Sequence, residues 1–306
     1  MYAPKLQIEH LLPTSIDCVD INCLLRSLSE FKHTIRALTT YPPRFQYDKK
    51  ILPRLSQILY HDTVTPLIDS LYETRKAVSS TGEILDIHSD ISPAEGKLLH
   101  GVIAEDPSIK HTIEVGCAHG LSSLHICEAL RGRDGAHHTI IDPFQNTNYN
   151  GLGVHHLNKA GIDFYEWVEE KSEFALPKLA KERPGTFDLA FIDGMHTFDH
   201  TLIDAFYSLR LLRVGGVLVI DDCDYFDGID KVISYLKNYP CLRVHAILEP
   251  PPPVTLRNHV RRALGGPIFQ SMLPHKMKER FRWRSSMVAL KKISEDNRPW
   301  DWYAPF

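Results

Sequence analysis

Residues 187–222 have the sequence FDLAFIDGMHTFDHTLIDAFYSLRLLRVGGVLVIDD, and this stretch decides the fold. Two apolar runs, Phe187–Ile192 and Gly216–Ile220, are typical of buried strands, and apolar residues at helical spacing lie between them. Each run leads directly into acidic residues. In an open α/β sheet, ligands bind beyond the carboxyl ends of the strands. The stretch therefore predicts two neighbouring parallel strands with a reaction centre at their ends.

The same alternation of strands and helices continues on both sides of this stretch. A short helix is expected to begin after Ser92, which is a plausible N-cap, with Pro93 at the first helical position. Further strands are expected at His111–Val115, His137–Ile141, Phe164–Val168, Leu242–Leu248 and Ser286–Lys292. Helices are expected at Leu121–Leu130, Asn150–Ala160, Glu173–Lys181, Thr201–Leu212 and Ile229–Lys237. This order predicts an α/β fold with a doubly wound parallel sheet.

Two segments lie outside this alternation. Residues 1–83 have mostly helical spacing and are expected to form an N-terminal helical cap or dimerisation region, so we expect a homo-oligomer. Residues 84–306 are expected to form the catalytic domain. Within that domain, residues 249–285 form an insertion that begins with four prolines and ends rich in basic residues. We expect it to be a lid or acceptor-binding region, or a lid helix with its charges facing water. The aromatic tail, residues 298–306, is expected to pack back on the domain.

Composition excludes several classes of protein. The chain has 306 residues, of which 43% are hydrophobic and 24% charged, as in ordinary globular proteins. A net charge of −3 gives no general reason to expect a nucleic-acid partner. No run approaches the roughly 20 apolar residues that a membrane span needs, and no signal peptide is evident. The six cysteines form no C-x-x-C pair, which favours reduced thiols and a cytoplasmic location.

A glycine-containing turn follows the strand His111–Val115. Its sequence, Glu114-Val-Gly116-Cys-Ala-His-Gly120, is neither the G-x-G-x-x-G dinucleotide fingerprint nor a P-loop. Glycines at such a turn allow a ligand to approach the backbone closely, although many similar patterns are only tight turns. Asp142 ends the next strand, where an acid can accept hydrogen bonds from both hydroxyls of a ribose.

These residues carry a resemblance to a known family. The segments ISPAEGKLL, IEVGCAHGLSSL, IIDPF, GIDFYEWVEEKSEFALPKL and residues 187–222 resemble the class I S-adenosylmethionine-dependent O-methyltransferases over roughly residues 84–240. The similarity is greatest to the metal-dependent branch, which includes catechol and caffeoyl-CoA O-methyltransferases and the bacterial enzymes that methylate macrolide sugars. The resemblance implies a seven-stranded sheet whose last strand, within Ser286–Lys292, is antiparallel.

The resemblance also implies a cofactor-binding role for five residues. Gly116 and Gly120 lie against the methionine and ribose end of S-adenosylmethionine, and Glu114 organises the loop. Asp142 binds the ribose hydroxyls, and Ser172 occupies the position that contacts adenine. His119 departs from the pattern, because the family usually has a small residue at that position of the loop.

The acids at the strand ends predict a metal site. Adjacent strands lie about 4.8 Å apart, so Asp193, Asp221 and Asp222 are expected to converge. Close carboxylates repel unless one holds a proton or a cation lies between them, and oxygen ligands suit Mg²⁺ or Mn²⁺. The resembling families place metal-binding acids at these three positions. They place a general base three residues after the first acid, which is His196 here, as in the sugar enzymes, where catechol-type enzymes have lysine.

The expected function is metal-dependent O-methylation of a hydroxyl on a sugar or another small natural product. The basic insertion favours an anionic acceptor, and Tyr149, Tyr225 and Phe226 are candidates for an aromatic acceptor platform. Several alternatives stay open. Asp193 could belong to a turn and Asp221-Asp222 to a helix cap, and the enzyme could be metal-independent or act on a catechol or phenol. A hydroxylase and a non-catalytic cofactor-binding relative are further alternatives, although no 2-His-1-carboxylate triad with clear spacing supports an iron oxygenase.

Overall fold

The structure is a computed structural model, and it describes residues 66–88, 90–248 and 285–304. The helices expected before residue 66 and almost all of the insertion at 249–285 lie outside the described residues. The helices of the described part are α3 (Pro66–Thr74), α4 (Pro93–Glu105), α5 (Leu121–Leu130), α6 (Leu152–Lys159), α7 (Ser172–Glu182), α8 (Phe198–Leu211) and α9 (Asp227–Leu236). Its strands are β1 (Lys76–Val78), β2 (Ile84–Asp86), β3 (His111–Val115), β4 (His137–Ile141), β5 (Tyr165–Val168), β6 (Phe187–Ile192), β7 (Leu212–Ile220), β8 (Leu242–Ile247) and β9 (Val288–Lys292).

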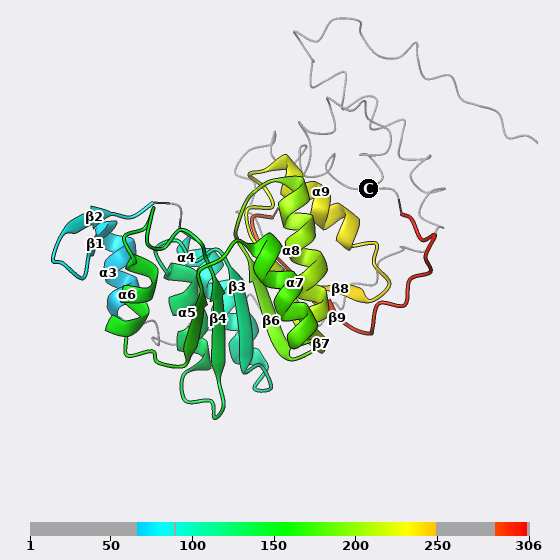
Figure 1. Cartoon of the computed structure of the whole chain (residues 1–306), viewed down its shortest axis with the longest axis horizontal. Coiled ribbons are helices and arrows are strands. Elements are labelled where there is room, and N and C mark those ends of the chain that lie inside the picture. The colour runs from blue at the N-terminus through cyan, green and yellow to red at the C-terminus, as the bar shows by residue number, and fades with distance from the viewer. Residues whose placement is uncertain (1–65, 89, 249–284, 305–306) are drawn as a thin grey trace, which may run out of the picture. The chain divides into compact units, whose positions relative to one another are not determined.

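Seven of these strands form one sheet in the order β5-β4-β3-β6-β7-β9-β8 (Figure 1). The pairs from β5 to β7 are parallel, whereas β9 runs antiparallel to both β7 and β8. The strand order reverses between β3 and β6, which is the kind of switch point where ligands bind in open α/β sheets. The predicted doubly wound sheet with an antiparallel last strand is confirmed.

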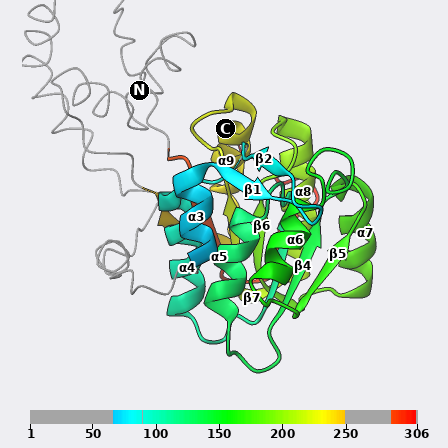
Figure 2. The same ribbon diagram turned by 90° about the vertical axis from the view of Figure 1, so that its left-hand side faces the viewer.

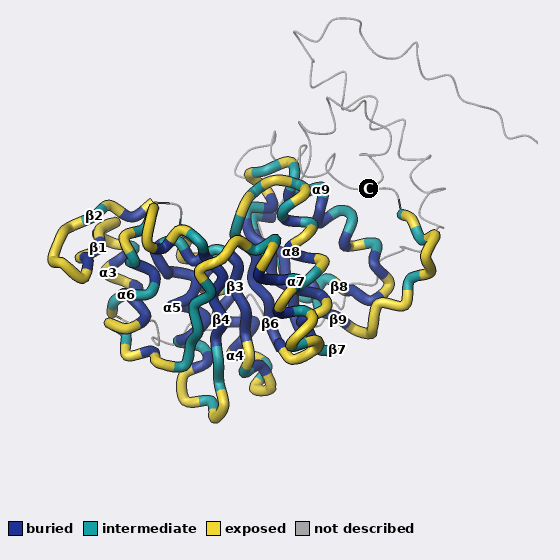
Figure 3. The backbone as a smooth tube through the Cα atoms, viewed as in Figure 1, coloured by how far each residue is buried: buried dark blue, intermediate teal, exposed yellow. Residues whose placement is uncertain are grey.

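Helices cover both faces of this sheet (Figure 2). One apolar cluster joins the sheet to α3, α4, α5 and α6, and the other joins it to α7, α8 and α9. β6 is buried at all six positions because it lies in the middle of the sheet, covered on both faces. The buried backbone follows the central strands, and the loops that join them are more exposed (Figure 3). The sheet is therefore a rigid platform for the loops at its carboxyl edge.

The helix α4 begins as the sequence predicts. The Ser92 hydroxyl accepts a hydrogen bond from the backbone N–H of Glu95 at 3.3 Å, and the Glu95 carboxylate accepts one from the Ser92 N–H at 2.6 Å. This reciprocal capping box fixes the first turn of the helix.

The described part of the N-terminal region differs from its helical prediction. Only Pro66–Thr74 is helical, and a two-stranded hairpin follows in which Lys76 pairs with Asp86. Each hairpin strand has only three residues, too few to show an alternating apolar pattern. Ile68 and Leu71 of α3 belong to the same apolar cluster as α4 and α5. The boundary between residues 83 and 84 stays a prediction, because most of residues 1–83 lie outside the described part.

Two more differences concern β7 and the tail. β7 begins at Leu212, four residues before the expected strand, and its pairing with β6 changes register between Phe187 and Leu189. The adjacent glycines Gly215 and Gly216 hid this start, because glycine is unfavourable inside strands. The aromatic tail, expected to pack back on the domain, does so only in part, because Trp300 is 97% and Tyr303 73% exposed. Arg298 lies 3.5 Å above the Tyr239 ring, and Trp302 packs against the second apolar cluster.

Candidate active site

Three strand ends meet at the carboxyl edge of the sheet. Ile192 of β6 pairs with Val115 of β3 on one side and with Ile220 of β7 on the other. The N–H of Asp193 donates to the carbonyl of Val115 at 2.9 Å, and the N–H of Asp221 donates to the carbonyl of Ile192 at 3.1 Å. The sequence therefore delivers the acids that follow β6 and β7 to one place, as predicted.

His196 lies between two of these acids. Its Nε2 is 3.2 Å from Oδ1 of Asp193 and 3.3 Å from Oδ2 of Asp222. One ligand atom from each of these three residues lies within 4.8 Å of the others, which is a grouping that can hold a metal ion. All three side chains are half-buried. The structure thus brings together the expected base and two of the three expected metal ligands.

Burial and mutual repulsion perturb these groups. Burial raises the pKa of Asp193 to about 6, against the lowering effect of its hydrogen bond with His196. Burial also raises the pKa of Asp222. Burial lowers the pKa of His196, but the hydrogen bond to Asp193 and the charges of both acids outweigh this, so the pKa lies above its usual value. The raised pKa values mean that the charged form of these carboxylates is unfavourable without a cation. A divalent cation between them would favour the charged form.

Asp221 is not one of the three residues whose ligand atoms lie within 4.8 Å of one another. Only 4% of its surface is exposed, and its Oδ1 accepts a hydrogen bond from the N–H of Asp222 at 2.9 Å. Burial, followed by the charge of Asp193, raises its pKa well above the usual range. Asp222 adopts a φ of 56°, which turns the chain sharply between the two acids. A ligand role for Asp221 stays a prediction.

Aromatic rings border this acidic group. The Phe226 ring stacks on the His196 imidazole, with 4.6 Å between centroids and 26° between planes. Tyr225 meets Phe226 edge-on at 4.8 Å and is 77% exposed. Two of the three aromatic residues proposed from the sequence therefore lie beside the acids, and Phe226 restrains the imidazole.

The glycine loop packs directly on the acidic loop. Gly116 and Gly120 have φ values of 86° and 85°, in the region that glycine adopts readily. A Cβ at Gly116 would overlap the backbone carbonyl of Asp193, and one at Gly120 would lie 2.9 Å from Cα of Gly153. The two glycines are therefore needed for close backbone packing. Gly120 has no side chain to cap α5. The free backbone N–H groups in the first turn of this helix therefore favour a negatively charged ligand.

Asp142 faces the glycine loop from the end of β4. Its Oδ2 accepts hydrogen bonds from the N–H groups of Cys117 and Ala118, each at 3.0 Å. Its Oδ1 accepts one from the N–H of Phe144 at 2.7 Å. The side chain is 2% exposed and holds the loop in shape. Binding of ribose by this carboxylate stays a prediction.

Glu114 lies below the loop and is fully buried. Its Oε2 accepts hydrogen bonds from the Ser123 hydroxyl and from Nε2 of His138, the latter at 3.1 Å. His138 is fixed in turn by the Thr112 hydroxyl, 2.8 Å from its Nδ1. Glu114 thus joins β3 and β4 to α5, which supports its expected role in organising the loop.

Ser172 is the first residue of α7. Its hydroxyl lies near Asp204 of α8, a carboxylate that is only 1% exposed. Burial raises the pKa of Asp204 to about 6, and the Ser172 hydroxyl opposes this shift. Asp204 also lies behind the acidic loop, where a Cβ at Gly194 would be 3.6 Å from its Oδ2. The adenine contact expected of Ser172 stays a prediction.

Gln145 belongs to the site but has no signal in the sequence. It is fully buried, and its Nε2 donates to the carbonyl of Ala118 at 2.7 Å and to Oδ2 of Asp142 at 3.0 Å. Its Oε1 accepts a hydrogen bond from the N–H of Gly153 at 3.0 Å. Two of these partners are backbone groups far along the chain, so no side-chain pattern identifies the residue. Gln145 clamps the glycine loop to the segment after β4.

Three comparisons find methyltransferases that are similar to this chain. A family profile described as "Methyltransferase domain" matches residues 113–223, which contain the glycine loop and all the clustered acids. A probable caffeoyl-CoA O-methyltransferase 1 of Dictyostelium discoideum is 27% identical over 188 residues, which cover 60% of this chain and 75% of that protein.

Solved structures share the fold at low sequence identity. An O-methyltransferase from Bacillus cereus, in complex with SAH, has a TM-score of 0.50 at 15% identity, covering 79% of this chain and 97% of that one. The O-methyltransferase TomG of Streptomyces achromogenes, in complex with SAM, has a TM-score of 0.50 at 16% identity, covering 82% and 100%.

The four cysteines in the described ranges are free and buried. Among the described residues, no helix has the length and apolar character that a membrane crossing requires. The family profile and the curated relatives support a methyltransferase enzyme that is similar to the class I S-adenosylmethionine-dependent O-methyltransferases, and the solved structures share its fold.

Proposed function

We propose that this enzyme methylates a hydroxyl group of a small acceptor in a site with two halves, one for the methyl donor and one for a divalent cation. The observation that carries the proposal is the convergence of Asp193, His196 and Asp222 within 4.8 Å, directly against the glycine loop. The glycine loop would hold the methyl donor, and the acidic group would hold the acceptor through a cation. Because the two loops touch, their ligands would lie close enough for methyl transfer.

The donor half consists of the loop from Gly116 to Gly120 and the acid that shapes it, Asp142. The positive φ values of the glycines and the uncapped start of α5 suit the close approach of S-adenosylmethionine. Ser172, at the start of α7, is the candidate for the adenine end. Each role rests on its position at the carboxyl edge and on the resemblance to the family.

The cation half consists of Asp193 and Asp222, with Asp221 as the third candidate ligand. The raised pKa values of these acids support a cation here, because a nearby positive charge would favour their ionised forms. Mg²⁺ or Mn²⁺ would supply Lewis acidity toward acceptor oxygens. The acids themselves fix where such an ion is held and bring the acceptor beside the donor loop.

His196 is the proposed general base. Its Nε2 faces the acidic group, and the Phe226 ring stacked on the imidazole limits rotation of the side chain. The Nε2 takes the proton of the acceptor hydroxyl, and Asp193 and Asp222 stabilise the imidazolium that forms. The acceptor oxygen would then attack the donor methyl group in line: the O–C bond forms as the C–S bond breaks, and S-adenosylhomocysteine leaves with the electron pair on its sulfur. Positioning would supply much of the rate.

The preferred acceptor is a sugar or another small natural product with two neighbouring oxygens. A phenolic acceptor of the catechol or caffeoyl type is the second candidate, because the 27% identical relative is a probable caffeoyl-CoA O-methyltransferase. The Asp-x-x-His spacing of Asp193 and His196 favours the sugar class. Tyr225 beside the acids offers a flat surface that either ring can use.

The test is transfer of a labelled methyl group from S-adenosylmethionine to a panel of acceptors. The panel contains catechol, caffeoyl-CoA, free sugars and nucleotide sugars, each with EDTA and with Mg²⁺ or Mn²⁺ restored. We expect transfer to one acceptor class, its loss in EDTA and its recovery with metal, while donor binding in EDTA is unchanged. Transfer that persists in EDTA would overturn the metal half, and oxygen-dependent turnover without methyl transfer would indicate a hydroxylase.

A further inference from the structure

Tyr149 lies at the join between the two halves of the site, on the loop between β4 and α6. This loop is tied to the glycine loop through Gln145, whose own carbonyl also accepts a hydrogen bond from the N–H of Gly151 at 2.6 Å. The N–H of Tyr149 donates to the carbonyl of Phe144 at 3.3 Å. The backbone that carries Tyr149 is therefore held at both ends.

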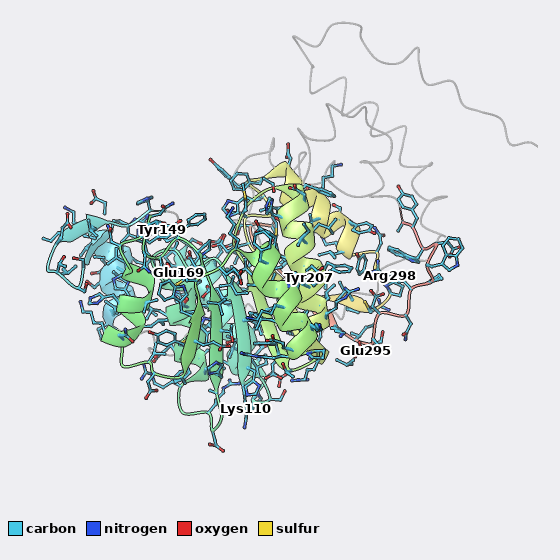
Figure 4. All side chains as sticks on the ribbon, viewed as in Figure 1. Lys110, Tyr149, Glu169, Tyr207, Glu295 and Arg298 are labelled. Carbon is cyan, nitrogen blue, oxygen red and sulfur yellow. The ribbon has the colours of Figure 1, made fainter. Side chains whose placement is uncertain are left out.

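The ring of Tyr149 is placed by the glycine loop itself. It meets the imidazole of His119 edge-on, with 5.1 Å between centroids and 79° between planes. His119 is 3% exposed and contacts His88 on its other side at 5.0 Å. Tyr149 lies at the opposite end of the sheet from Lys110, which precedes β3, and so at the edge where the parallel strands end (Figure 4). The unusual histidine of the glycine loop thus serves as a support for this tyrosine.

The charges of one carboxylate from each half of the site act on the phenol of Tyr149. Burial, then the charges of Asp142 and Asp193, raise the pKa of Tyr149. The side chain is half-buried, so one part of the ring packs on His119 while another part is open. Asp142 belongs to the donor half and Asp193 to the cation half.

We infer that Tyr149 is a donor-binding residue whose aromatic ring packs against the positively charged sulfonium of S-adenosylmethionine and holds its methyl group toward Asp193. This inference rests on the proposed function. Aromatic rings attract cations, and the attraction increases when the site excludes water. S-adenosylhomocysteine has the same adenosine and amino-acid ends but no positive charge on sulfur. The ring should therefore favour the substrate over the demethylated product.

The test compares the two ligands by isothermal titration calorimetry of the full chain. The informative variants are Tyr149→Phe, which keeps the ring, and Tyr149→Leu, which removes the ring but keeps apolar volume. Tyr165→Phe is the matched control, because it removes a hydroxyl bonded to Asn158 at the first residue of β5, away from the carboxyl edge. Thermal melts of all variants establish that they fold.

We expect Tyr149→Leu to weaken S-adenosylmethionine binding about tenfold and S-adenosylhomocysteine binding less than about twofold. Tyr149→Phe and the control should keep the wild-type ratio of the two affinities. Equal losses for both ligands, or no loss for either, would overturn the inference and leave the proposed function standing. Failure of the wild-type chain to bind either ligand would overturn the proposed function itself.

Discussion

His196 is the residue on which the proposed chemistry depends most. Replacement by alanine removes the only imidazole between Asp193 and Asp222 among the described residues but touches no group of the glycine loop. We expect His196→Ala to slow methyl transfer by about a hundredfold or more while donor affinity stays within about twofold of wild type. Labelled-methyl assays and calorimetry measure the two effects.

His200→Ala is the matched control, since His200 lies in the first turn of α8, after the loop that carries His196, and contacts Thr197 and Asp199 instead. The control should retain wild-type turnover. Donor affinity that falls together with turnover in His196→Ala would contradict its role as base.

Asp204 gives a prediction about stability and pH. Its pKa is about 6 in the folded protein, above that of an exposed aspartate, so the folded state binds the proton more tightly than the unfolded state does. Stability therefore falls as the pH rises from about 4 to 6, and the penalty above pH 6 is at most about 3 kcal/mol. Asp204→Asn should raise the free energy of unfolding at pH 7.5 and have less effect at pH 4.

Urea unfolding at the two pH values checks this prediction. Asp163→Asn, at an exposed position outside the helices and strands, is the control and should change little at either pH. An equal effect of Asp204→Asn at pH 4 and pH 7.5 would show that the carboxylate carries no such penalty.

Residue-level predictions from sequence depend on whether partners lie close along the chain. Asp193 and His196 were predictable because three residues separate them in one loop, and the structure confirms that they meet. Gln145 and Asp204 were not predictable, because their contacts come from segments that only the folded sheet brings together. The sequence also could not show that Asp221 is outside the group of ligand atoms that lie within 4.8 Å of one another.

The glycine loop is the element whose shape matters most. Gly116→Ala would place a methyl group on the Asp193 carbonyl in addition to the strain of a positive φ, so the loop must move. We expect a loss of about 2 kcal/mol or more in stability, together with loss of donor binding. Thermal melts and calorimetry measure the two losses.

The variant Gly132→Ala separates the cost of backbone strain at a positive φ from the cost of steric overlap by an added Cβ. Gly132 also has a positive φ, 76°, but nothing lies within 4 Å of an added Cβ. This variant should show only the smaller cost of strain and should bind the donor normally. Similar effects of the two substitutions would mean that the backbone contact between the glycine loop and the acidic loop is unimportant.

Elements with strong apolar patterns were predicted well. β3, β4, β6 and α5 match their expected bounds, and each is largely buried in the sheet or against it. The hairpin of β1 and β2 was missed because its short strands are mostly exposed, and β7 began earlier than expected because of its glycines. The spacing of apolar residues thus predicts the elements that are buried. It does not predict elements whose bounds are set by local turns.

In the part of the chain that the structure describes, one sheet carries both halves of the proposed site. The glycine loop follows β3 and the acids follow β6 and β7, so three adjacent strands fix the distance between the proposed donor and cation sites. This arrangement was predictable from the alternation of elements and from the resemblance. The acceptor class was not predictable, because the segments expected to select it, residues 1–83 and 249–285, have no family pattern.

The most direct measurement of the two-part site is sequential calorimetry. S-adenosylmethionine is titrated into the wild-type chain and Asp193→Asn, and Mn²⁺ is then titrated into each complex. Asp199→Asn, an exposed acid at the start of α8, is the control. We predict one donor site in all three proteins, within about twofold in affinity, and one Mn²⁺ site that only Asp193→Asn loses. Mn²⁺ binding as tight in Asp193→Asn as in the wild type, or no donor binding by the wild type, would contradict the account.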